Sequence, residues 1–197
     1  MKCLLIIDPQ NDFCPGGALA VAGGDSIMQP INDLMAGYEL IVLTQDWHPQ
    51  GHSSFASSHE GMAPFSLLEM PYGPQVLWPD HCIQTSAGAA FHAHLNTTKA
   101  DAIIRKGTNP QVDSYSAFFE NDKTTSTGLS GFLRDRGCAD ITMVGLATDY
   151  CVAWSALDGV NQGFNVEVKL SLCRAIDLDG SLDAAHNAMR AAGVGMT

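Results

Sequence analysis

The sequence has few charged residues and very few basic ones. Charged side chains are 16% of the 197 residues, and 10 Lys and Arg stand against 21 Asp and Glu, for a formal net charge of −11 at pH 7. An acidic chain of this kind repels the phosphates of nucleic acids and anionic membrane surfaces, so we expect neither as a partner. Hydrophobic residues nevertheless make up 46% of the chain, which excludes disorder along its whole length.

The sequence also lacks a long hydrophobic run, a signal-peptide pattern, an internal repeat and a low-complexity tract. None of its apolar runs approaches the roughly 20 residues that span a bilayer. Its six cysteines are scattered, and a core of this size needs no disulfide framework, so we expect free thiols in a reducing compartment, the cytoplasm. The length favours a single domain over residues 1–197.

Short apolar runs alternate with stretches of helical character. The runs predict strands over residues 3–7, 40–43, 102–104, 141–146 and 166–170. Helices are expected to begin near Asp25 or Ser26, Leu129, Thr148 and Ser181. Strands that alternate with helices predict an α/β fold, a mainly parallel sheet covered on both faces. The alternating fifth run predicts an edge strand, and the chain ends soon after Gly195, which leaves little room for a sixth strand.

Polar or reactive side chains follow several of the predicted strands. They are Asp8, Asp46, Lys106 and Cys151. In parallel sheets ligands bind beyond the carboxyl ends of the strands, so we expect these side chains to project into one site. The segment at about 45–100 is rich in His, Pro, Gly and Ser and has little periodicity. A loop region of that length in a compact domain is usually functional.

A metal site is one interpretation of the histidines in this loop region. Asp46 and His48 lie two residues apart after a strand, where an extended backbone sends alternate side chains to the same side. His81 is a candidate third ligand and His52 a possible fourth, and Cys82 could ligate in place of His81. Two His and one carboxylate leave open positions on zinc, iron or manganese. A solvated loop with ordinary surface histidines is the alternative.

Cys151 has the features of a nucleophilic thiol. It lies in the first turn of a predicted helix, where the helix dipole favours a thiolate. Lys106 could add positive charge nearby, and Asp8 could take the thiol proton. The alternative is an inert buried thiol, which is what we expect of Cys138. We interpret Asp149 as a charge that stabilises the start of the helix.

Five segments carry motifs whose order and spacing are specific in combination. They cover residues 6–13, 44–49, 78–82, 105–107 together with 113–118, and 144–152. In this combination the chain resembles, nearly end to end, the nicotinamidases of the isochorismatase-like cysteine hydrolase superfamily. The resemblance implies a three-layer α/β/α fold with a roughly six-stranded sheet.

The resemblance also implies roles for particular residues. The implied catalytic triad is Asp8, Lys106 and Cys151. The implied ligands of one divalent metal ion are Asp46, His48 and His81, with His52 in doubt. A cis peptide bond at Leu146–Ala147 and an oxyanion hole made by the backbone N–H groups of Ala147 and Cys151 are implied as well. Phe13, Trp78 and Tyr115 match positions that line the nicotinamide pocket, and Leu19 and Tyr150 are further candidates.

The implied activity is hydrolysis of nicotinamide to nicotinate and ammonia through a thioester on Cys151, with pyrazinamide as a further substrate. An isochorismatase or another amidohydrolase of the superfamily is an alternative, although isochorismatases lack the nucleophilic cysteine. A metal-binding or redox-sensing module without turnover is a second alternative. The implied partner is a small molecule, and both a monomer and a homo-oligomer remain open.

Overall fold

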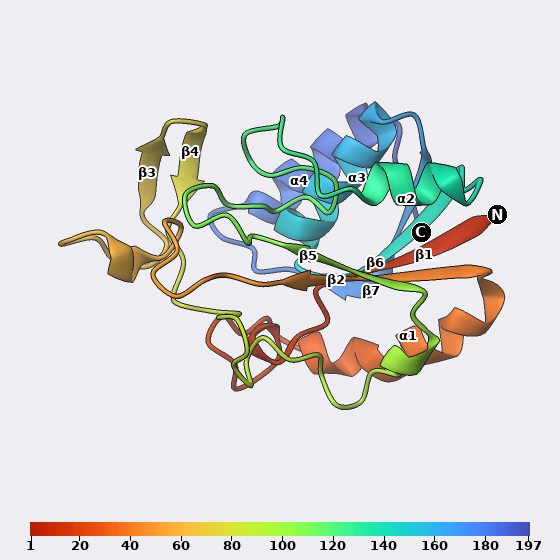
Figure 1. Cartoon of the computed structure of the whole chain (residues 1–197), viewed down its shortest axis with the longest axis horizontal. Coiled ribbons are helices and arrows are strands. Elements are labelled where there is room, and N and C mark those ends of the chain that lie inside the picture. Colours follow the sequence, from red (N-terminus) through yellow and green to blue (C-terminus); the bar gives the residue numbers. More distant parts are fainter.

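A six-stranded parallel sheet forms the centre of the molecule (Figure 1). The computed structural model describes residues 1–197. The strands are β1 (Lys2–Ile7), β2 (Leu40–Asp46), β5 (Ala102–Lys106), β6 (Asp140–Leu146), β7 (Asn165–Arg174) and β8 (Gly195–Met196), in the spatial order β5-β2-β1-β6-β7-β8. Every neighbouring pair is parallel. The predicted α/β fold with a parallel sheet is therefore confirmed.

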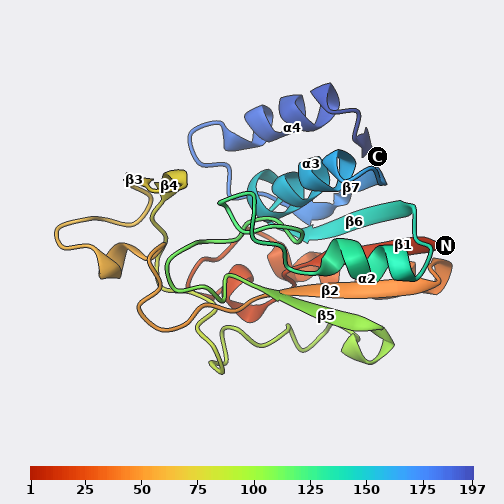
Figure 2. The ribbon, with the colours of Figure 1, turned by 45° about the horizontal axis from the view of Figure 1, so that its top comes forward.

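Helices cover both faces of the sheet. Helix α1 (Met28–Leu34) lies on one face, and α2 (Leu129–Asp135), α3 (Ala153–Asn161) and α4 (Ser181–Ala191) lie on the other (Figure 1). Helix α4 packs against α3 and is the outermost element in Figure 2. The first predicted helix starts later than expected, because a 3-10 turn over Gly24–Ile27 precedes α1. No helix combines the length and the apolar composition needed to cross a membrane.

The central strand β1 is completely buried. Its residues Cys3 to Ile7 are all 0% exposed, as expected for a parallel strand covered by helices on both faces. Its neighbour β6 approaches closely at Gly145, where a Cβ atom would lie 2.2 Å from the carbonyl oxygen of Ile7. Gly145 also has a φ of +123°, so glycine suits this position on both counts.

The predicted edge position of residues 166–170 is wrong. These residues lie in β7, which pairs with β6 on one side and with β8 on the other. β8 has only two residues, and backbone hydrogen bonds from Leu170 to Thr197 and from Thr197 to Val168 extend its pairing. The alternating pattern arises because one face of β7 packs inward while the other is only half-buried.

The loop region at about 45–100 contains structure that no sequence pattern indicated. Strands β3 (Leu67–Met70) and β4 (Gly73–Val76) form an antiparallel hairpin separate from the main sheet. The hairpin projects beyond the carboxyl ends of the parallel strands (Figures 1 and 2). It therefore stands at the end of the molecule where the candidate site residues gather.

Candidate active site

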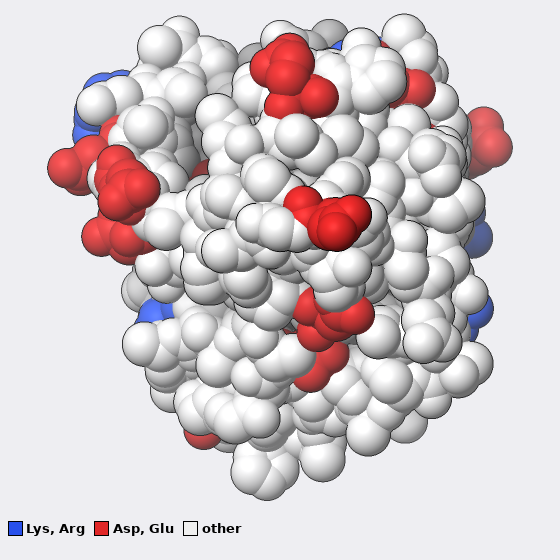
Figure 3. All heavy atoms as spheres, turned by 90° about the vertical axis from the view of Figure 1, so that its left-hand side faces the viewer, with Lys and Arg blue, Asp and Glu red and all other residues white.

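A pocket lies at the carboxyl end of the sheet. It is lined by Phe13, Leu19, Asp46, Trp78, His81, Asp113, Tyr115, Ala147, Tyr150, Cys151 and Ile176. All five side chains that the resemblance assigned to a substrate pocket are in this set. Figure 3 views this end of the molecule, and acidic side chains are spread across the face while basic ones lie at its margins.

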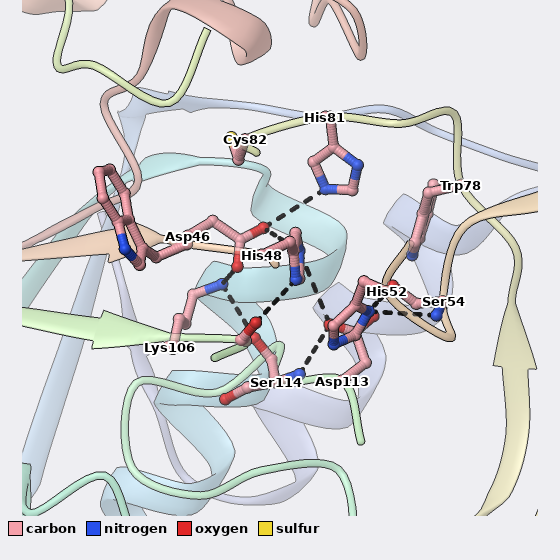
Figure 4. Close-up of polar contacts among 12 residues, drawn as sticks. Asp46, His48, His52, Ser54, Trp78, His81, Cys82, Lys106, Asp113 and Ser114 are labelled. Atoms are coloured by element: carbon pink, nitrogen blue, oxygen red, sulfur yellow. Dashed lines mark hydrogen bonds and ion pairs between the residues drawn. The ribbon is translucent and has the colours of Figure 1, made fainter. Parts of the chain in front are cut away.

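Lys106 lies at the centre of the buried charges beside the pocket. It ends β5, and its Nζ lies 2.9 Å from Asp8 Oδ2, 3.1 Å from Asp46 Oδ1 and 3.4 Å from Cys151 Sγ. It also donates a hydrogen bond to the carbonyl of Ser114 (Figure 4). Burial alone would lower the pKa of Lys106, but the two carboxylates outweigh it and raise the pKa well above the ordinary range. The ammonium therefore stays charged, and the structure brings the predicted triad together.

The two carboxylates that flank Lys106 differ in basicity. Burial raises the pKa of Asp8, which is 0% exposed, and Lys106 only partly offsets this effect. Burial alone would also raise the pKa of Asp46, but His48 and Lys106 outweigh it and hold the pKa well below its usual range. Environments that separate the pKa values of two carboxyls assign them different roles. Asp8 is suited to take a proton, whereas Asp46 stays ionised.

Cys151 sits in a π-helical turn over Thr148–Val152 that leads into α3. Burial raises the pKa of its thiol well above the usual range, and Lys106 only partly offsets this. The expectation that the helix terminus favours a resting thiolate is therefore wrong, because desolvation of the buried sulfur dominates. The resting group is a thiol, and its attack requires a base.

The predicted metal ligands converge on the other side of Asp46. Its Oδ2 lies 3.0 Å from His48 Nε2 and 3.4 Å from His81 Nε2 (Figure 4). His48 Nδ1 donates to the carbonyl of Gly107 at 3.0 Å, and His81 Nδ1 donates to the carbonyl of Pro79 at 2.8 Å. With Nδ1 as the donor nitrogen, the Nε2 atom of each ring faces a carboxylate oxygen and can offer its lone pair to a metal ion. Such a donor set fits a divalent cation, with its imidazoles oriented by backbone carbonyls.

Gly107 and Gln10 support this ligand set, and sequence reasoning gave neither a role. Gly107 has a φ of +64°, and a Cβ atom there would lie 2.4 Å from the ring of His48. Gln10 is fully buried, and its amide accepts from the backbone N–H of Asp46 and donates to the carbonyl of the same residue, both at 2.7 Å. The signal was present in the motifs, but only the folded chain shows what these residues touch.

His52 is buried beside the ligand set with both ring nitrogens already bonded. Its Nε2 donates to the carbonyl of Asn109 at 2.7 Å, and its Nδ1 accepts from Ser54. Burial and the neighbouring His48 lower the pKa of His52, which favours the neutral ring. His52, His48 and Asp113 do converge as a second group of possible ligands. A fourth ligand at His52 therefore stays a prediction, and it would require breaking one of these bonds. Cys82 belongs to neither group.

Asp149 does more than place a charge at the start of a helix. Its Oδ1 accepts from the backbone N–H of Ile176 at 3.0 Å, and its Oδ2 accepts from the N–H of Asp177 at 2.7 Å and the hydroxyl of Ser181 at 2.5 Å. Asp149 thus fixes the loop that places Ile176 in the pocket wall. Asp149 does lie in the first turn of the helix, as expected, and its carboxylate also satisfies the loop donors. Ile176 lines the pocket without any sequence signal, and Asp113 lines it as the first residue of a motif that gave it no role.

Aromatic side chains form much of the pocket wall. Trp78 and Tyr115 each meet Tyr150 edge to face, with ring centroids 4.8 and 5.6 Å apart. Tyr115 Oη accepts hydrogen bonds from Trp78 Nε1 at 3.0 Å and from Gln75 Nε2 at 2.7 Å, which fixes both rings. Ala147 also lines the pocket, and the Leu146–Ala147 peptide bond is cis, as the resemblance implies. A pocket of this kind suits a flat aromatic ring.

Comparisons with known proteins found a matching family model and several similar proteins. The isochorismatase domain model matches residues 2–197. A nicotinamidase from Acinetobacter baylyi is 52% identical over 97% of this chain and 89% of its own length. The structure of a nicotinamidase and pyrazinamidase from Acinetobacter baumannii is 52% identical, with a TM-score of 0.98 over 99% of this chain and 94% of that one. The structure of a Pyrococcus horikoshii pyrazinamidase in complex with zinc is 33% identical, with a TM-score of 0.80 over 100% of this chain and 98% of that one.

Proposed function

Because the chain belongs to the nicotinamidases of the isochorismatase domain family, we propose that it hydrolyses nicotinamide to nicotinate and ammonia. One observation carries the proposal: a buried thiol, Cys151, lies 3.4 Å from the charged Lys106 beside a pocket walled by aromatic rings. The pocket is suited to the pyridine ring, and the thiol lies where the carboxamide carbon would be attacked.

The proposed reaction runs through a thioester. Asp8 takes the proton of the Cys151 thiol as the sulfur attacks the carboxamide carbon, and Lys106 offsets the negative charge. Asp8 then passes this proton to the departing nitrogen, which leaves as ammonia. A water molecule attacks the thioester carbon while Asp8 takes one of its protons. The C–S bond breaks, Asp8 returns that proton to the sulfur to regenerate the thiol, and nicotinic acid leaves and ionises to nicotinate.

Two backbone donors are proposed to stabilise the tetrahedral intermediates. The N–H groups of Ala147 and Cys151 belong to residues that line the pocket, and they would donate to the oxygen that becomes negative. A donor of this kind contributes roughly 3–4 kcal/mol in related acyl transfers. The raised pKa of buried Asp8 assists the same step, since Asp8 must take the thiol proton while these donors stabilise the negative oxygen.

Asp46, His48 and His81 are proposed to hold one divalent metal ion. When bound, the ion would supply a positive centre that orients the substrate through its ring nitrogen. The zinc complex of the Pyrococcus relative supports this proposal and favours zinc among zinc, iron and manganese. Gln10 would keep Asp46 in place through its backbone, and Gly107 would keep His48 in place through its carbonyl.

Pyrazinamide is proposed as a second substrate, because it presents the same carboxamide on a flat ring of the same size. The Acinetobacter baumannii relative is described as both a nicotinamidase and a pyrazinamidase, which supports this.

The cytoplasm is the proposed compartment, since all six cysteines are free thiols and the reaction needs a reduced Cys151. Nicotinate formed there would feed NAD salvage.

An ammonia-release assay tests the proposed function. The zinc-loaded protein should release ammonia from nicotinamide, and Cys151→Ala should lower kcat at least about a thousandfold. Cys138→Ala, which also removes a buried thiol, is the matched control and should keep the activity. The proposal fails if the zinc-loaded protein releases no ammonia, or if Cys151→Ala is as active as the control. Zinc binding without turnover would favour a non-catalytic module.

A further inference from the structure

Thr44 is joined to Asp8 by two hydrogen bonds, one to the side chain and one to the backbone. Thr44 Oγ1 donates to Asp8 Oδ1 at 2.6 Å, and the backbone N–H of Asp8 donates to Thr44 Oγ1 at 3.0 Å. Both residues are 0% exposed. A hydroxyl has a single proton, so the proton of Thr44 is committed to Oδ1.

The two oxygens of the Asp8 carboxylate therefore have different surroundings. Oδ1 is held by Thr44, whereas Oδ2 accepts no hydrogen bond of good geometry and only faces Lys106 Nζ at 2.9 Å. The same Lys106 Nζ lies 3.4 Å from Cys151 Sγ, which places the thiol on the Oδ2 side of the carboxylate. The oxygen with a free lone pair is thus the one on the side of the lysine.

We propose that Thr44 is a positioning residue for the amidase reaction, holding Asp8 Oδ1 so that Oδ2 is the atom that takes the proton of the Cys151 thiol. The proposal rests on the proposed function, since it assigns the base of that reaction to one atom. The proton moves from Sγ to Oδ2 while the S–C bond forms, and the Thr44 hydrogen bond persists because protonated Asp8 still offers Oδ1 as an acceptor.

Thr44 also stabilises the backbone conformation of Asp8. Asp8 has a φ of +45°, in the left-handed region that side chains other than glycine disfavour. Strands β1 and β2 are parallel, and Ile6 pairs with Leu43. Asp8 and Thr44, which come shortly after these two residues, therefore lie side by side. The bond from the Asp8 N–H to Thr44 therefore holds the turn that aims the carboxylate at the thiol. Thr44 itself is stiff about χ1, because it is β-branched and lies in a buried strand.

Steady-state kinetics on nicotinamide with the zinc-loaded protein test this role. Thr44→Val keeps the shape and removes the hydroxyl, and we expect kcat to fall roughly 10- to 100-fold with little change in KM, as for loss of a hydrogen bond to a charged group. Thr44→Ser restores the hydroxyl and should stay within about threefold of the unmodified protein. Thr142→Val is the matched control, since Thr142 is a buried threonine of β6 whose hydroxyl faces Glu167 and makes no hydrogen bond to Asp8.

A second readout separates this proposal from the proposed function. Iodoacetamide should modify Cys151 more slowly in Thr44→Val than in the unmodified protein, while Cys138 reacts at an equal rate in both. Thr44→Ala carries the same expectations if Thr44→Val does not fold. A folded Thr44→Val with unchanged kcat, or a Thr44→Ser that loses as much as Thr44→Val, overturns the role of the hydroxyl. An inactive unmodified protein overturns the proposed function instead.

Discussion

The candidate site has two halves that meet where Lys106 touches Asp46, and they balance their charges differently. The nucleophile half contains Asp8, Lys106 and Cys151, and its buried carboxylate already has a cation 2.9 Å away. The metal half contains Asp46, His48 and His81, where two imidazole Nε2 atoms face one carboxylate oxygen and no cation of the chain lies between them. The nucleophile half is therefore complete within the chain, whereas the two imidazoles and the carboxylate of the metal half could hold a cation from solution.

The largest effect is expected from removing the cation that the two halves share. Lys106→Met leaves Asp8 and Asp46 buried without their ion pair, and we expect a loss of about 3–5 kcal/mol in the free energy of unfolding. Urea unfolding measures it. Lys123→Met is the matched control, because Lys123 pairs with Asp158 at 2.9 Å but is 45% exposed, and it should cost less than about 1 kcal/mol. Equal losses in the two variants would contradict a charge-balanced nucleophile half.

A change at Gly107 should damage the metal half alone. Gly107→Ala places a methyl group against the ring of His48, and we expect zinc affinity to fall by about 10- to 100-fold. Calorimetric zinc titration measures it, and Cys151 should still react with iodoacetamide at its usual rate. Gly131→Ala in α2 is the control, since nothing lies within 4 Å of its added methyl group. Unchanged zinc affinity in Gly107→Ala would show that the two halves are not separable in this way.

The metal half should also respond to pH in a defined direction. Burial alone would lower the pKa of His48, but Asp46 outweighs it and raises the pKa in the metal-free protein. The stabilisation from protonated His48 is thus fully present below the pKa of an unfolded histidine and is lost as pH rises through the raised pKa. Zinc must displace this proton, so the zinc-induced rise in Tm should increase with pH.

Thermal unfolding with zinc and with chelator, compared across pH, checks this prediction. Free zinc at 100 times its Kd should add about 2.7 kcal/mol. A rise in Tm on zinc addition that shrinks as the pH increases would contradict the assignment of His48 as a ligand. The nucleophile half should not contribute to the zinc-induced rise in Tm, since its carboxylate is paired with Lys106.

The smallest effect is expected outside both halves, at the loop that closes the pocket. Asp149→Asn weakens the bonds to Ile176, Asp177 and Ser181, and we expect a loss of about 1–3 kcal/mol in the free energy of unfolding. KM for nicotinamide should rise because Ile176 loses its place in the pocket wall, while zinc affinity stays constant. Steady-state kinetics and zinc titration check both. A raised zinc Kd without a change in KM would place Asp149 in the metal half instead.

Much of the fold and the site could be predicted because their signals are local. Apolar runs marked the strands, and Asp8, Asp46 and Lys106 follow or end strands whose carboxyl ends meet in a parallel sheet. The spacing of Asp46 and His48 placed both on one side of an extended segment. Three local signals were enough to identify these residues: the alternation of side chains along a strand, the position at a strand end, and the order of the motifs in the sequence.

The remaining features depend on contacts between distant segments. Thr44 matters because Asp8 lies 36 positions away in sequence but adjacent in space. Asp149 lies in the first turn of a helix, as expected, but its hydrogen bond to the loop that carries Ile176 does not follow from that position. The thiol state of Cys151 follows from its burial, which its position at the start of a helix does not reveal. No local pattern carries these facts, since each arises from packing.

The central claim is that the nucleophile half acts through Cys151, and locating the essential thiol tests it most directly. The zinc-loaded protein is treated with limiting iodoacetamide, and peptide mass spectrometry measures modification at each cysteine while ammonia release is followed in the same samples. We predict that activity falls in proportion to modification of Cys151 and is independent of modification of Cys138. Full activity in protein whose Cys151 is completely modified would contradict the account.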